Sequence, residues 1–287
     1  MNLALNQHVT LSDGRKIGFA EYGDPHGKPM LYFHGTPGSR LEQHPDHTIA
    51  SALGLHIIAP DRPGYGISDV QTNRTLLDWA VDITQLMDAL EIEHCPILGF
   101  SGGGPFAMAC AHQLPDRCSM LGLVSSVAPF DNSHGTQGMN SQSEALYQLA
   151  LADPQAFSAQ IDALVTDGDT LFQIMTSALP DIDQAVFSQQ LFKKMYLSNM
   201  REAIYHSVDG TVSDMLLFPR AWGFSPQDIS CKTLLWQGEG DCNVPSTMGR
   251  FLSETIPHCT SYFIPNSGHY LLFTRWREIL KILSDSE

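Results

Sequence analysis

The chain has 287 residues, of which 43% are hydrophobic, and its 16 basic and 31 acidic side chains give a formal net charge of −15. A chain of this length can bury a large core as one globular unit, whereas its acidity argues against binding to nucleic-acid phosphates, anionic membrane surfaces or polyanionic substrates. We therefore expect no nucleic acid as a partner. The acidity by itself implies no preferred substrate, and the expected partner is a small-molecule substrate.

The apolar segments are too short for a membrane span or a leader. Residues 1–8 lack the basic start and apolar run of a signal peptide, and no segment approaches about 18 uninterrupted apolar residues. The six cysteines form no C-x-x-C pair, which is typical of reduced, mostly buried thiols. His44 and His47 have metal-like spacing, but Pro45 lies between them and no further ligand pattern follows. We expect a cytoplasmic protein with no metal and no cofactor.

Strand and helix patterns alternate through the first part of the chain. Two strands, over residues 7–11 and 16–22, flank a hairpin-like turn at Ser12-Asp13-Gly14. Short apolar runs then predict buried strands over 30–33, 56–59, 96–100 and 120–127, and helical periodicity predicts helices over 75–90 and 104–114. This alternation predicts an α/β fold with a mostly parallel sheet and helices on both faces.

The middle of the chain has a different pattern. From about Phe130 to Phe218 no segment is a convincing strand, and apolar residues recur at helical spacing. Strands are expected again over 233–236 and 261–264, so the middle is predicted to be a helical insertion between two halves of the sheet. Its Phe and Met side chains either line a pocket or only pack the helices together. As substrate-pocket candidates we take Phe100, Met175, Phe192 and Tyr196.

A G-x-S-x-G motif lies between a predicted strand and a predicted helix, at Gly99-Phe100-Ser101-Gly102-Gly103. A serine in such a sharp turn projects from the strand end toward the free N–H groups of the helix, which suits a nucleophile. The alternative is a glycine-rich helix start with a structural serine. The context favours Ser101 as the nucleophile.

A base and an acid follow Ser101 in the order that such a site needs. Serine requires a base to take its proton, and His269 follows a late strand in Asn266-Ser267-Gly268-His269. Asp241 follows another strand and precedes an expected helix start near Pro245. Since the carboxyl ends of parallel strands meet at one edge, we expect Ser101, Asp241 and His269 to converge there. Glu239 is the competing acid.

Acyl transfer also needs N–H donors for a negatively charged oxygen. The backbone N–H of Gly102, directly after the serine, is one candidate. The loop His34-Gly35-Thr36-Pro37-Gly38 follows the strand over 30–33, and the N–H of Thr36 is the second candidate. The alternative for this loop is a plain tight turn.

Together these segments resemble the α/β-hydrolase superfamily in order and spacing. They are His34 to Pro37, Asp61 to Ser68, Gly99 to Gly104, Gly238 to Pro245 and Gly268-His269. The resemblance implies an eight-stranded, mostly parallel sheet and a helical cap over the active site, and it places the chain in a serine-nucleophile, esterase-like branch. With it we expect a core domain over 1–128 and 219–287 and a helical cap, or lid, over 129–218. Asp61 to Ser68 and His34 are then supporting elements.

Departures from particular relatives narrow the expected chemistry. Relatives that open epoxides or remove halides attack with aspartate and dienelactone-type relatives with cysteine, where this chain has Ser101. Prolyl iminopeptidase relatives usually carry tryptophan after the nucleophile, where this chain has Gly102. Haloperoxidase and perhydrolase relatives share the same Ser-Asp-His triad, so their reactions are not excluded by these residues.

The sequence thus predicts a serine hydrolase that cleaves a carboxylic ester, thioester or activated amide of a small to medium, largely apolar substrate through an acyl-enzyme. One alternative keeps the triad and changes the reaction to that of a C–C hydrolase, a perhydrolase or a lyase. Another is a small-molecule binding or signalling protein on a hydrolase scaffold.

Overall fold

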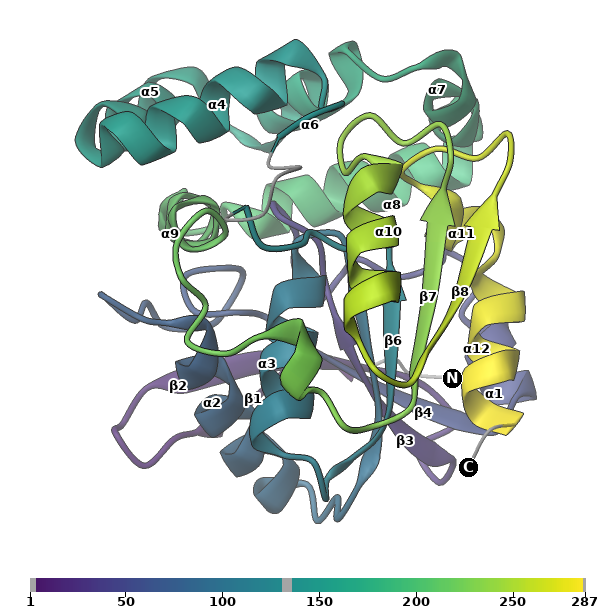
Figure 1. Cartoon of the computed structure of the whole chain (residues 1–287). Coiled ribbons are helices and arrows are strands. Elements are labelled where there is room, and N and C mark those ends of the chain that lie inside the picture. Colours follow the sequence, from purple (N-terminus) through teal and green to yellow (C-terminus); the bar gives the residue numbers. More distant parts are fainter. Residues whose placement is uncertain (1–3, 131–135, 286–287) are drawn as a thin grey trace.

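The computed structural model describes residues 4–130 and 136–285, and an eight-stranded sheet runs through it (Figure 1). The order across the sheet is β1-β2-β4-β3-β5-β6-β7-β8; β2 pairs antiparallel with β1 and β4, and the other pairs are parallel. The expected eight-stranded, mostly parallel sheet is therefore confirmed. The strands are β1 (Ala4–Thr10), β2 (Lys16–Gly23), β3 (Lys28–Phe33), β4 (Leu55–Pro60), β5 (Cys95–Phe100), β6 (Cys118–Val124), β7 (Thr233–Gly238) and β8 (Cys259–Ile264).

Helices cover both faces of the sheet, and each face has its own apolar core. Successive strand side chains point to opposite faces, so Leu31 and Phe33 of β3 join one core while Met30 and Tyr32 join the other. The first core includes α2 (Leu76–Ala89), α3 (Gly103–Gln113) and α10 (Ser246–Thr255). The second includes α1 (Thr48–Ala52), α11 (Leu271–Thr274) and α12 (Trp276–Asp285).

In the described residues between β6 and β7, six α-helices form the helical insertion, in the upper part of Figure 1. They cover the edge of the sheet where the parallel strands end. A 3-10 helix, Pro226–Asp228, precedes β7. The helices of the insertion are α4 (Ser141–Ala152), α5 (Pro154–Leu164), α6 (Gly168–Ser177), α7 (Asp181–Ser188), α8 (Gln190–Ala203) and α9 (Asp209–Leu217). Residues 131–135 of the expected cap and residues 1–3 and 286–287 of the expected core lie outside the described residues.

The strand expected over residues 120–127 is shorter in the structure. β6 ends at Val124, because Ser125 has a φ of 48°, in the left-handed region that no strand residue adopts. The Ser125 N–H instead donates to the carbonyl of Trp236 at 2.9 Å. Apolar periodicity cannot reveal such a backbone reversal.

Several sequence expectations concern thiols, metals and membranes. The six cysteines are free thiols, and the Sγ atoms of Cys118 and Cys231 are 3.9 Å apart. His44 accepts the backbone N–H of Asp46, and His47 stacks on Tyr22. In the part of the chain that the structure describes, no three His, Cys, Asp or Glu residues are grouped as metal ligands. Within the same residues, no helix has both the length and the apolar character needed to cross a bilayer.

Asp214 in α9 joins the helical insertion to the core through a buried ion pair. Its Oδ2 accepts Arg62 Nε at 2.9 Å and Nη2 at 2.7 Å, and its Oδ1 accepts from Arg74. The hydroxyls of Tyr65 and Thr36 also donate to Oδ2, at 2.9 and 2.8 Å. Burial alone raises the pKa of Asp214, but the charges of Arg62 and Arg74 outweigh it and hold that pKa below its ordinary value.

Replacing Asp214 with asparagine is expected to destabilise the fold, because two buried guanidinium groups lose their counter-charge. Removing one partner of a buried ion pair costs about 3–5 kcal/mol, to be measured as the free energy of unfolding in urea at pH 7. A carboxylate with a depressed folded pKa stabilises the fold above its unfolded pKa of about 3.9. The difference in unfolding free energy between the wild type and Asp214→Asn should therefore shrink as pH falls below that value and vanish below the folded pKa.

The matched control is Asp169→Asn, which breaks an exposed ion pair with Arg201 and should change stability little. Equal unfolding free energies for Asp214→Asn and Asp169→Asn would contradict the role of Asp214.

Candidate active site

Ser101 occupies the turn between β5 and α3. Its φ is 53°, a left-handed conformation that non-glycine residues rarely adopt and that is common at functional turns. Gly103 makes the turn possible, since a Cβ atom there would overlap the carbonyl oxygen of Phe33. The serine thus lies at the carboxyl end of β5 and at the amino end of α3, as the motif predicts.

His269 and Asp241 are hydrogen bonded to each other at the same edge of the sheet. Asp241 follows β7, His269 follows β8, and the Asp241 Oδ2 lies 2.9 Å from the His269 Nδ1. The other oxygen of Asp241 accepts the N–H groups of Asn243 and Val244, both at 2.9 Å, just before α10. Because Nδ1 donates to the carboxylate, Nε2 is left as the proton acceptor.

The competing acid, Glu239, lies elsewhere. Its side chain is 44% exposed and its Oε1 is 3.5 Å from Arg250. Asp241, whose side chain is fully buried, is the carboxylate in contact with the histidine.

The surroundings of His269 favour its charged form. Burial alone lowers the pKa of His269, but the charge and hydrogen bond of Asp241, with smaller contributions from Asp183 and Glu42, outweigh it. The pKa of His269 therefore lies above its ordinary value of about 6.5. An imidazole of raised basicity, oriented by a carboxylate, is suited to take up a proton.

Ser101 and His269 line one cavity, of about 310 Å³. Their side chains make no direct hydrogen bond to each other. The contact between a nucleophile and its base is often long until substrate binds and tightens in the complex.

Thr36 and Gly102 border the cavity beside Ser101. They are in close contact, because a Cβ atom at Gly102 would overlap the Thr36 hydroxyl. Among the described residues, nothing accepts the backbone N–H of either one. The Thr36 hydroxyl is held by Asp214 at 2.8 Å, which fixes the loop. Two unpaired N–H groups beside a serine can bind an oxyanion.

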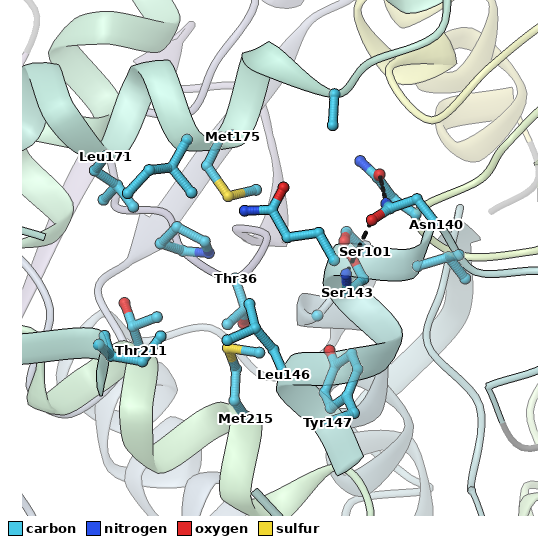
Figure 2. Close-up of a pocket in the computed structure, with 18 of the residues that line it drawn as sticks. Thr36, Ser101, Asn140, Ser143, Leu146, Tyr147, Leu171, Met175, Thr211 and Met215 are labelled. Atoms are coloured by element: carbon cyan, nitrogen blue, oxygen red, sulfur yellow. Dashed lines mark hydrogen bonds between the residues drawn. The ribbon is translucent and has the colours of Figure 1, made fainter. Parts of the chain in front are cut away.

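The rest of the cavity wall is mostly apolar, and its polar side chains are uncharged. Figure 2 shows Leu171 and Met175 of α6, Leu146 of α4 and Met215 of α9 around the space that Ser101 and Thr36 border. Polar groups come mainly from Asn140, Gln142, Ser143, Gln160 and Asn243. Asn140 accepts the Ser143 N–H at 2.9 Å and donates to Asn243 at 2.9 Å. The described lining residues include no Asp, Glu, Lys or Arg.

The four pocket candidates from the sequence are placed differently from one another. Met175 lines the cavity, whereas Phe100, Phe192 and Tyr196 are not among its described lining residues. Phe100 packs against His269, with ring centroids 5.2 Å apart. Phe192 packs on Phe273, and Tyr196 packs on Phe187 of α7 and on Tyr270 of the core. The apolar or aromatic character of these side chains could not show which neighbour each one packs against.

Sequence reasoning missed most polar residues of the site. Asn140 caps α4, and its Asn-Ser-x-Ser pattern is an N-cap signal that could have placed it. Asp183 and Asp214 lie in helices of the insertion and belong to no motif. Only the three-dimensional structure brings them to the His269 and Thr36 loops.

Replacing Asp241 with asparagine is expected to lower the pKa of His269, because the largest charge that favours the imidazolium is removed while burial persists. The pKa is to be followed by NMR titration of the His269 ring. Glu239→Gln removes an exposed charge on the same loop and should leave that pKa near the wild-type value. An unchanged pKa in Asp241→Asn would show that the pair does not control the histidine.

Known proteins resemble the chain along nearly its whole length. The family model for the alpha/beta hydrolase fold matches residues 28–275. A non-heme chloroperoxidase of Streptomyces lividans is 34% identical over 42% of the chain and 45% of the relative, so the match spans less than half of that relative. A 2-hydroxy-6-oxononadienedioate/2-hydroxy-6-oxononatrienedioate hydrolase of Comamonas testosteroni is 28% identical over 76% of the chain and 71% of the relative.

Solved structures agree on the fold. A hydrolase from Pseudomonas aeruginosa superposes with a TM-score of 0.74 at 15% identity, covering 98% of both chains. An esterase from Exiguobacterium antarcticum superposes with a TM-score of 0.69 at 19% identity, covering 98% of this chain and 99% of its own. With the family match over residues 28–275, these findings show that the chain belongs to the α/β-hydrolase family.

Proposed function

We propose that the protein is a serine hydrolase that cleaves a carboxylic ester, or a thioester or activated amide, through an acyl-enzyme. The observation that carries the proposal is the hydrogen-bonded Asp241–His269 pair in a cavity that also holds Ser101 in a strained turn. In this proposal the helical insertion is a cap over that cavity, with the core over 1–128 and 219–287 and the cap over 129–218.

The reaction starts with proton transfer. His269 Nε2 takes the proton of Ser101 as the serine oxygen attacks the substrate carbonyl, and Asp241 stabilises the imidazolium that forms. The N–H groups of Gly102 and Thr36 bind the negatively charged oxygen of the tetrahedral intermediate. His269 then protonates the leaving group, and later takes a proton from the water that releases the acyl group from Ser101.

The cavity supports a neutral, mainly apolar substrate. Its described lining has no Asp, Glu, Lys or Arg, and His269 must be neutral to act as the base, so a substrate carboxylate would be buried without a cation. A volume of about 310 Å³ suits a small to medium molecule. This argues against substrates like the dicarboxylate named for the Comamonas relative.

Ser101, Asp241 and His269 could also serve other reactions, and turnover of test substrates distinguishes among them. Perhydrolysis and C–C bond cleavage are the competing reactions, since one relative is named a chloroperoxidase and another a hydrolase of a 2-hydroxy-6-oxo dienedioate. An esterase turns over simple aryl esters readily, whereas a binding protein holds its ligand with negligible turnover.

A fluorophosphonate is expected to label wild-type protein once, on Ser101, because only an activated serine attacks the phosphorus. The adduct is located by mass spectrometry of the digested protein. Ser101→Ala should carry no adduct, whereas Ser177→Ala, which alters an exposed serine of α6, should label like the wild type. If neither a fluorophosphonate nor a smaller phosphonylating reagent labels the wild type, the serine is not activated and the proposal fails.

Neutral esters are expected to be better substrates than esters with a terminal carboxylate. The kcat/KM for p-nitrophenyl hexanoate should exceed that for the p-nitrophenyl monoester of adipic acid by about tenfold or more, because an unpaired buried charge is strongly disfavoured. Met175→Lys supplies a cation in the wall and should narrow this ratio, with Met175→Leu as the size-matched control. Equal kcat/KM values for both esters in the wild type would rule out the neutral-substrate assignment.

A further inference from the structure

A buried carboxylate from the helical insertion holds the backbone of the His269 loop. Asp183 lies in α7 and is 1% exposed. Its Oδ2 accepts the N–H of His269 at 3.0 Å, and its Oδ1 accepts the N–H of Tyr270 at 3.0 Å. Since both oxygens act as acceptors, the geometry fits the ionised carboxylate. Asp183 is separated from His269 by more than eighty positions, and none of the motifs in the sequence includes it.

Gly268 is required by this contact. A Cβ atom at Gly268 would overlap the carboxylate of Asp183. Its φ is not in the left-handed region, so the glycine is needed for the close approach of the acid rather than for a turn. The Gly268-His269 pair in the sequence is thus explained by a residue of the insertion.

Other residues also hold the His269 loop. Among the described residues of the insertion, Asp183 is the side chain that is hydrogen bonded to the backbone of this loop. Ser125 donates to the carbonyl of His269 at 3.0 Å from the end of β6, and Asp241 holds the ring from the end of β7. Tyr270 is held in turn by Tyr196 of α8, with the two hydroxyl oxygens 2.9 Å apart.

We propose that Asp183 is a positioning residue for His269, through which the helical insertion sets the place of the general base. The inference rests on the proposed hydrolase function. Two adjacent N–H groups on one carboxylate fix both the position and the orientation of the backbone that carries the imidazole. A displacement of about 1 Å in such a group is enough to lower the rate about a hundredfold.

The charge of Asp183 has a second effect. The titratable groups that face His269 are Asp241 after β7, Asp183 in α7, Glu42 after β3 and the neighbouring Tyr270; Asp183 also faces Tyr196 and Cys242. Burial and, less strongly, the charge of Asp241 raise the pKa of Asp183 above its ordinary value, and the two backbone N–H groups and His269 oppose that rise only in part. The Asp183 carboxylate adds to Asp241 in raising the pKa of His269, so its removal should lower the pKa of the base.

Asp183→Asn tests both effects in the full-length protein. An amide keeps one acceptor oxygen and turns its NH₂ group toward the other N–H. The kcat for a p-nitrophenyl ester, expressed per site labelled by the fluorophosphonate, should fall about ten- to a hundredfold with KM little changed. The acid limb of the kcat/KM profile should move to lower pH. Asp181→Asn, an exposed acid of the same helix, should behave as the wild type.

Gly268→Ala separates the effect of the position of Asp183 from the effect of its charge. It is also the test variant if Asp183→Asn does not fold. It displaces the carboxylate without removing it, so kcat per labelled site should fall as well, with a smaller shift of the acid limb. Circular dichroism and thermal melting establish that each variant is folded.

The outcomes distinguish this inference from the proposed function. If the wild type is not labelled, the hydrolase proposal fails and the inference fails with it. If the wild type is labelled but a folded Asp183→Asn has wild-type kcat per labelled site and a wild-type acid limb, Asp183 is only structural and the inference alone is overturned. If Asp183→Asn does not fold, a wild-type kcat per labelled site and a wild-type acid limb in a folded Gly268→Ala overturn the inference.

Discussion

The left-handed turn at Ser101 is the constraint around which the site is arranged. A serine with a φ of 53° between β5 and α3 is tolerated because α3 packs closely against the end of β3, where a side chain at Gly103 would not fit. This packing brings the loop after β3, with Thr36, to the serine. The parallel order of β5, β6, β7 and β8 then brings the loops of Asp241 and His269 to the same edge.

The helical insertion is more than a wall of the cavity. Helices α7, α8 and α9 each place a buried polar side chain against a loop of the core. Asp183 accepts from the His269 loop, Asn199 bonds to Ser39 and Glu42 behind Thr36, and Asp214 binds Arg62 and Arg74. Helices α4, α5 and α6 supply much of the apolar lining instead. These anchoring contacts therefore come from the second half of the insertion, whereas the lining comes mainly from the first half, with Met215 of α9 added.

Features encoded by neighbouring residues could be predicted from the sequence. The sheet, the turn at Ser101 and the strand ends that carry Asp241 and His269 follow from apolar runs bounded by glycine and proline, because strand and turn preferences are local. Contacts between distant segments could not be predicted. Asp183 and Asp214 occur in ordinary helical patterns. The aromatic character of Phe192 and Tyr196 suits burial, but it does not show which residues they pack against. The reversal at Ser125 depends on its bond to β7.

The buried ion pair of Asp214 has a consequence for exchanging parts between relatives. Arg62 and Arg74 belong to the core and are fully desolvated, so a chimera that replaces the whole insertion strands two buried cations unless the donor carries an acid at the position of Asp214. A transplant limited to α4, α5 and α6 leaves Asp183, Asn199 and Asp214 in place. The boundary between α6 and α7 is therefore the natural junction for grafting a new acyl-binding wall onto this scaffold.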